Sequence, residues 1–181
     1  MAFATALNRG TRLVSMLSDH IIMTIITMIL WAPGFIVQMI ASQHSVQTSE
    51  GFMGLYAAMA FSAYLNKDVY LGQSIGKRLL RFKVINKKTG ELAGPLRCLV
   101  RNLTLIFWPI EVIMAMVNVH ERLGDYIAGT MLVNYEQPPV GKPNWMMIVV
   151  ALLLGIAFMY VVVVLPIFGL TQAMQSFRPV H

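Results

Sequence analysis

The chain has 181 residues, of which 57% are hydrophobic and 12% are charged, and its formal net charge is +6. Soluble proteins carry about 25% charged residues, and a chain this apolar leaves more hydrophobic surface than one small core buries. The composition excludes disordered, collagen-like and disulfide-framework proteins, and it predicts an all-α integral membrane protein.

The first membrane helix is expected from about Gly10 to Trp31, where Pro33-Gly34 is expected to end it. An apolar run preceded by two arginines is also typical of a cleaved signal peptide. Asp19 and His20 lie inside the run, however, and no A-x-A cleavage site follows it. We therefore expect a retained helix.

A second, shorter helix is predicted over residues 51–66. The segment before it, residues 35–49, contains no Lys or Arg, which places it outside the cell and the N-terminus in the cytoplasm. The two helices then form a hairpin. Gly54, Ala58 and Ser62 form a stripe of small residues that lets another helix approach closely, although an alanine-rich composition alone also produces such stripes.

A basic segment follows the hairpin. Nine Lys or Arg lie between Lys67 and Arg101, against only Asp68 and Glu91, a pattern typical of a cytoplasmic loop facing anionic lipids. Membrane lipids, rather than nucleic acid, are the expected partner. The candidate headgroup contacts are Lys77, Arg78, Arg81, Lys83, Arg97 and Arg101.

Two elements are predicted within this segment. Residues 79–86 alternate apolar and basic side chains and are followed by a Lys-Lys-Thr-Gly sequence, which predicts a small cytoplasmic β-hairpin. After Pro95 the spacing becomes helical, with Leu96, Leu99 and Val100 on one face and arginines on the other. This pattern predicts an amphipathic helix lying in the membrane interface.

The third hydrophobic region, residues 102–118, contains Pro109 and Glu111 at its centre. A straight span would place a carboxylate in mid-bilayer, at a cost of about 2.5–3.5 kcal/mol if it is charged. The alternative is a broken, re-entrant region folded at Trp108-Pro109, which enters and leaves on one side. The sequence favours the re-entrant form only slightly, and the side of the C-terminus depends on this choice.

The last hydrophobic region, from Trp145 to Leu165, has no charged residue and predicts an extra C-terminal transmembrane helix. We therefore divide the chain into a membrane domain over residues 1–135 and a linker, helix and short tail over residues 136–181.

Five ionisable residues form a candidate polar cluster or ion site: Arg12, Asp19, Glu111, Arg122 and Asp125. Asp19 is the most informative, because a carboxylate in hydrocarbon must be protonated, paired or in a wet cavity. Arg12 lies about 10 Å from it along the helix axis, too far for direct contact. A proton or cation site and a structural ion pair both remain open for Asp19. Asp125 is also a candidate helix cap.

No catalytic motif is present. The chain lacks the P-loop, H-E-x-x-H and G-x-S-x-G patterns, so we expect neither an enzyme nor a bound cofactor. Cys98 is the only cysteine, which excludes an intramolecular disulfide and a cysteine-based zinc cluster.

Three stretches together resemble the RDD family of bacterial membrane proteins. They are an R-x6-D pattern from Arg12 to Asp19, the GQSIGKRLLRFKVINKKTGE stretch with LVRN after it, and ERLGDYIAGTMLV with Asp125. The resemblance covers about residues 9–135. It implies a multi-pass protein of the bacterial inner membrane, with the arginine and two aspartates linked in one cluster.

Two functions are consistent with these features. The first is transport of protons, cations or small ligands through the buried cluster, with Asp19 alternating between protonated and cation-bound states. Because three or four spans make a thin wall, this function predicts a homo-oligomer or a larger membrane complex. The second is a non-catalytic accessory or scaffold subunit that packs through the Gly54 stripe and the final helix.

Overall fold

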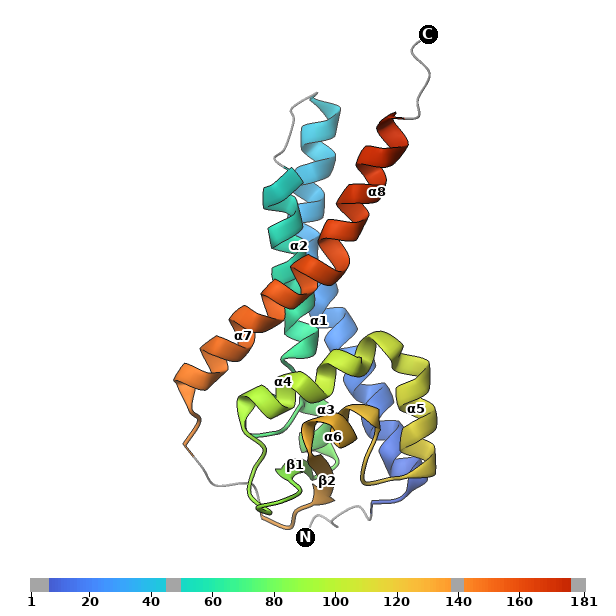
Figure 1. The fold of residues 1–181 in the computed structure, drawn as a ribbon, viewed down its shortest axis with the longest axis vertical. Helices are drawn as coiled ribbons and strands as arrows, with labels where there is room; N and C mark the ends of the chain where they lie inside the picture. The colour runs from blue at the N-terminus through green and yellow to red at the C-terminus, as the bar shows by residue number, and fades with distance from the viewer. Residues whose placement is uncertain (1–6, 45–49, 138–141, 177–181) are drawn as a thin grey trace.

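The computed structural model describes residues 7–44, 50–137 and 142–176 and is mostly helical (Figure 1). The helices are α1 (Arg9–Gln43), α2 (Glu50–Leu65), α3 (Ile75–Leu79), α4 (Pro95–Leu103), η1 (Thr104–Phe107), α5 (Trp108–Val117), α6 (Leu123–Ala128), α7 (Trp145–Met159), η2 (Tyr160–Val164) and α8 (Leu165–Ser176). Strands β1 (Phe82–Asn86) and β2 (Thr130–Asn134) form the sheet. Helices α1, α2 and α7–α8 form a long stem, and the remaining elements gather at its lower end (Figure 1).

Three apolar helical runs in the described residues are long enough to cross a membrane: Arg9–Gln43, Pro95–Val117 and Trp145–Leu170. The first is about 52 Å long at 1.5 Å per residue. The expected end at Pro33-Gly34 is therefore wrong. The hydroxyl of Tyr56 donates to the carbonyl of Leu30 in the turn that Pro33 weakens, and its ring packs on Gly34. The carbonyl that loses its helical donor to Pro33 is that of Ile29, so this bond does not replace the missing one, but it ties α2 to the turn that the proline interrupts.

The third apolar run is bent and does not cross straight. Between α4 and α5 the backbone leaves helical geometry at Phe107, with φ −97° and ψ 44°, and α5 turns back toward the lower end (Figure 1). Strands β1 and β2, which flank this run in sequence, pair antiparallel with Val84 opposite Leu132. Because paired strands lie side by side, the region between them begins and ends at the same end of the molecule, as the re-entrant alternative requires.

The small antiparallel sheet expected from the sequence is present, but the main partner of β1 is not the segment just after it. The predicted hairpin is present as a short return of the chain: the N–H of Asn86 donates to the carbonyl of Glu91 at 2.8 Å, that of Ala93 donates to the carbonyl of Val84 at 3.0 Å, and Ile85 forms an isolated bridge with Leu92. The reason for the different main partner is burial: Phe82, Val84 and Leu132 are fully buried in one cluster, and the partner that completes this cluster is β2.

The final helix packs into the core. Gly54 of α2 faces η2 so closely that an added Cβ would lie 2.6 Å from Val164 Cγ1, and Ala58 and Ser62 are buried. On α7, a Cβ at Gly155 would lie 2.4 Å from Asn66 Nδ2. The small-residue stripe therefore does allow close helix packing, but it is used inside the chain.

Candidate functional site

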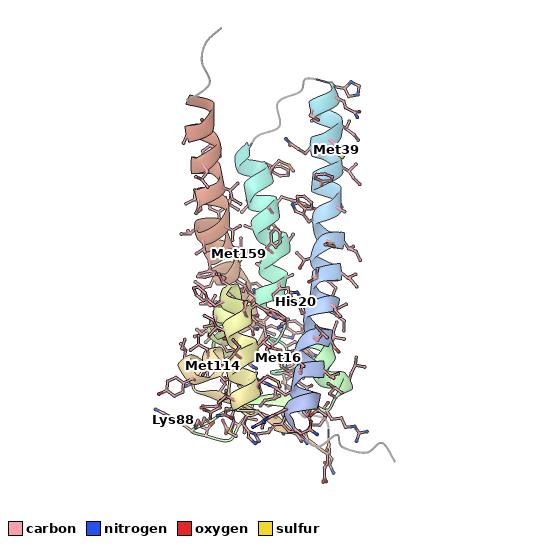
Figure 2. The ribbon with its side chains drawn as sticks, turned by 90° about the vertical axis from the view of Figure 1, so that its right-hand side faces the viewer. Met16, His20, Met39, Lys88, Met114 and Met159 are labelled. Carbon is pink, nitrogen blue, oxygen red and sulfur yellow. The ribbon has the colours of Figure 1, made fainter. Side chains whose placement is uncertain are left out.

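Eight charged side chains are buried together at the lower end of the stem. Each is at most 4% exposed, and they come from α1, α3, α4, α5, α6 and the adjoining loops: Arg12, Asp19, Asp68, Lys77, Arg101, Glu111, Arg122 and Asp125. Side chains crowd this level around Met16 and His20, whereas Met39 lies high on the stem (Figure 2). Salt bridges and shared hydrogen bonds link these eight side chains into one network.

Asp125 is the point where three arginines meet. Its carboxylate lies 2.9 Å from Arg101 Nε, 3.2 Å from Arg12 and 3.7 Å from Arg122. The Thr130 hydroxyl donates to it at 2.8 Å, and the backbone N–H of Arg122 donates at 3.3 Å. Asp125 is therefore both a helix cap and a cluster member. Burial alone raises the pKa of Asp125, but the three arginines hold that pKa below its usual range.

Glu111 joins the re-entrant run to α6. Its Oε1 accepts the backbone N–H of Gly124 at 2.8 Å, and its Oε2 lies 3.2 Å from Arg122 Nε. Arg122 also donates to Asn102 Oδ1 at 2.6 Å. Gly124 is required here because an added Cβ would lie 1.9 Å from the carbonyl oxygen of Arg101.

Asp19 belongs to the other half of the network. It accepts hydrogen bonds from Lys77 at 2.9 Å, from the Ser74 hydroxyl at 2.6 Å and from the backbone N–H of Gly76 at 3.0 Å. The GQSIGK stretch is thus a binding loop for a carboxylate of this chain. Arg12 and Asp19 bind different partners, as their separation along α1 predicts.

Asp68 connects the two halves. It lies 2.6 Å from Lys77 and 3.6 Å from Arg101, and it accepts a hydrogen bond from Asn102 at 3.2 Å. Burial alone raises the pKa of Asp68, but Lys77 and Arg101 outweigh this effect and hold that pKa well below its usual range.

A small cavity of about 10 Å³ lies between the halves, room for a group the size of a water molecule. Five cations line it, from Arg12, Lys67, Lys77, Arg101 and Arg122, together with Asp19 as the one carboxylate. Its remaining walls include Met16, Leu105 and Trp108.

Lys67 differs from the other four cations. It makes no salt bridge with any described residue, and its Nζ lies 4.9 Å from the centre of the Tyr64 ring. Burial, reinforced by repulsion from Lys77 and Arg122, lowers the pKa of Lys67 from 10.5 to about 7, although Asp19 and Asp68 oppose this. This ammonium group therefore loses its proton near neutral pH.

His20 contacts Trp108, one of the residues that line the cavity. A nitrogen of its ring is hydrogen-bonded to the Tyr64 hydroxyl, and the ring centre lies 5.2 Å from that of Trp108. In the parts of the chain that the structure describes, no three His, Cys, Asp or Glu side chains are placed to hold a metal ion.

All five residues of the sequence-derived cluster, namely Arg12, Asp19, Glu111, Arg122 and Asp125, are buried in this network. Two of the expected headgroup contacts are wrong. Lys77 and Arg101 are ion-paired in the interior, because buried carboxylates bind them more closely than a lipid surface does. Arg97 is exposed and donates to the carbonyl of Ala128 at 2.9 Å, Arg78 is exposed beside Tyr70, and Arg81 and Lys83 are partly buried.

Sequence reasoning missed Asp68, Lys67 and Asn102 as members of the site. Asp68 and Lys67 follow the second helix directly, where charged residues usually mark the end of a span. The one available signal was the Asp68 carboxylate itself, which stands out in a strongly basic segment.

The geometry agrees with comparison to known proteins. The model of the RDD family matches residues 8–175 and so extends through α7 and α8, beyond the expected limit at Tyr135. Neither the curated proteins nor the solved structures include a match. The family model matches most of the chain, the described residues include three long apolar helices, and the arginine and both aspartates lie in one buried network. The chain therefore belongs to the RDD family of membrane proteins.

Proposed function

We propose that this protein transports a small charged solute across the bacterial cytoplasmic membrane and that the buried network is its solute site. The observation that carries the proposal is the cavity inside the network, which is lined by five cations and one carboxylate. A purely structural lock needs no cavity, and buried ion pairs are replaceable by apolar residues with little or no loss of stability.

The geometry changes the role of Asp19 in such a transporter. Its two oxygens already accept hydrogen bonds from Lys77, Ser74 and Gly76. An external cation would have to displace the Lys77 ammonium group before reaching this carboxylate. A solute therefore enters by exchanging with, or binding beside, the cations of the chain.

The transporting unit is proposed to be an oligomer. The stem exposes apolar side chains along α1 and α7–α8, for example Ile29, Ile36 and Leu153. These faces suit lipid or another membrane helix, and one stem of so few helices does not enclose a pathway.

Vesicle transport tests the proposal. Purified protein in proteoliposomes with a pH-sensitive dye inside should show flux or a pH change when gradients of K⁺, Na⁺ or Cl⁻ are imposed. Asp19→Asn should abolish the signal while keeping a cooperative thermal unfolding transition, and Asp19→Glu should restore part of it. Glu91→Gln, on an exposed turn, is the matched control and should transport normally. Absence of any ion or proton movement by the wild-type protein rejects transport.

The proposed orientation places the N-terminus and the β1–β2 sheet in the cytoplasm. Single cysteines introduced at Thr89 and Gln137, in a background with Cys98 replaced, should react only with reagents that reach the cytoplasm. A cysteine at Ser42 should react only from the outside. Labelling of Thr89 and Gln137 from opposite sides contradicts the re-entrant arrangement.

An accessory subunit is the second candidate, favoured by an apolar groove between α2 and α7–η2. Leu55, Leu153, Ile156 and Tyr160 line it, and it is suited to a helix of another membrane protein. This function predicts a stable partner in fixed proportion after purification in mild detergent. Isolation of this chain alone, from cells expressing it at its natural level, contradicts it.

A further inference from the structure

The charges around the cavity do not balance. The network and Lys67 together contribute five cations, from Arg12, Lys67, Lys77, Arg101 and Arg122. They contribute four carboxylates, from Asp19, Asp68, Glu111 and Asp125. When Lys67, which is partly buried, is protonated, the site therefore carries one more positive than negative charge.

One buried donor at the cavity is also unused, and a second, partly buried cation beside it has no salt-bridge partner among the described residues. The Nε of Arg12 is buried and has no hydrogen-bond acceptor among the described residues, although its terminal nitrogen binds Asp125. The Lys67 ammonium group, on a partly buried side chain, contacts the Tyr64 ring and makes no salt bridge with a described residue, although Asp19 and Asp68 lie near enough to attract it. Burying the Arg12 Nε without an acceptor is unfavourable, so a ligand that accepts a hydrogen bond from it is favoured.

The carboxylate at the cavity, in contrast, is fully engaged. Asp19 is the one carboxylate lining the cavity, and Lys77, Ser74 and Gly76 already bind it. A cation entering the cavity would meet five like charges at close range and low dielectric, whereas an anion meets five opposite charges. The small volume excludes a whole lipid headgroup.

We propose that this cavity binds a single-atom monovalent anion, a halide, and that Lys67 must carry its proton for the anion to bind. The inference rests on the proposed transport function, for which it names the class of solute, but binding is measurable without transport.

The surroundings of Lys67 support the coupling between proton and anion. Tyr64 of α2 contacts its ammonium group, and Asp68 is its neighbour in the same loop. Arg12 and Asp19 of α1 line the same cavity, as do Lys77, Arg101 and Arg122. His20 is hydrogen-bonded to Tyr64. With a pKa of about 7 for Lys67, anion binding weakens as pH rises past neutrality. By linkage, a bound anion in turn favours the protonated lysine.

Trp108 lines the cavity and provides the measurement. In a variant with Trp31→Phe and Trp145→Phe, Trp108 is the only tryptophan, and bromide, which quenches indole fluorescence on contact, is the probe. We expect saturable quenching at pH 6 and an apparent affinity about tenfold weaker at pH 8, from the fraction of protonated Lys67 on either side of pKa 7.

Variants of Lys67, made in the protein that has Trp108 as its only tryptophan, test whether Lys67 is required for bromide binding. Lys67→Met should lose the saturable component, while Lys88→Met, an exposed lysine, should keep it. Lys67→Arg, which stays charged at both pH values, should bind bromide with nearly equal affinity at pH 6 and pH 8. This second variant keeps the test decisive if Lys67→Met does not fold.

Non-saturable quenching in the unmodified Lys67 background overturns the proposal, as does an unchanged titration in a folded Lys67→Met variant. Bromide binding without vesicle flux supports anion binding and rejects transport. Cation or proton flux insensitive to both bromide and Lys67→Met supports transport and rejects the anion site.

Discussion

Removing the charge of Asp125 tests whether the network is one electrostatic unit. In Asp125→Asn the amide oxygen can still accept from Thr130, but Arg12, Arg101 and Arg122 lose the carboxylate on which they meet. Removing one partner of a buried ion pair costs about 3–5 kcal/mol because the other charge stays buried and unpaired. For a chain of this length the unfolding midpoint then falls by roughly 6–20 °C, at about 2–4 °C per kcal/mol.

The matched control lies four residues earlier in the same segment. Glu121 pairs with Lys87 at 2.6 Å, but the lysine side chain is 54% exposed, so Glu121→Gln should cost at most about 1 kcal/mol. Thermal unfolding of both purified variants in the same detergent, followed by tryptophan fluorescence, provides the comparison. Equal, small shifts for the two variants would refute the view that Asp125 holds three buried arginines.

The remaining predictions concern pH and packing. The folded-state pKa of Lys67, about 7, lies below its ordinary 10.5, so the unfolded chain binds more protons between these values and stability rises as pH increases from 7 toward 10.5. Lys67→Met should flatten this rise in unfolding midpoints measured across that range. Gly124→Ala should destabilise the fold by about 1–3 kcal/mol or more, since its Cβ meets the carbonyl of Arg101 at 1.9 Å. Gly169→Ala, with open space around it, should leave the unfolding midpoint unchanged or slightly raised, as checked in the same melting experiment.

The site residues that could be identified from the sequence are those whose residue type is unusual among their immediate neighbours in the chain. Asp19 stands out because it interrupts an apolar helix, and Glu111 because it follows a proline in a hydrophobic run. Lys77 and Arg101 carry no comparable local signal, because they lie among nine basic residues of one segment. Which cations turn inward depends on Asp68 and Asp125 reaching them in the folded chain, a contact that periodicity does not encode.

The same distinction explains the fold. Hydrophobic length identified the membrane helices, since it is a property of each segment alone. The pairing of β1 with β2 joins residues 82–86 to residues 130–134, and no local pattern specifies a partner so distant. Pro33 misled the prediction for a related reason: the hydroxyl that binds the turn it interrupts comes from Tyr56 on another helix.

The glycines Gly76 and Gly124, in the GQSIGK and ERLGD stretches, have the same physical task. The backbone N–H of Gly76 donates to Asp19, and that of Gly124 donates to Glu111, at 3.0 and 2.8 Å. A Cβ at Gly76 would lie 2.6 Å from Asp19 Oδ1, so a side chain there would push the carboxylate off its donors. Each glycine therefore lets a carboxylate from a separate helix bind backbone as well as cations. Because Asp19, the one carboxylate that lines the cavity, is engaged in this way within the protein, the cavity is left to the cations that surround it, and its preference is for negative charge.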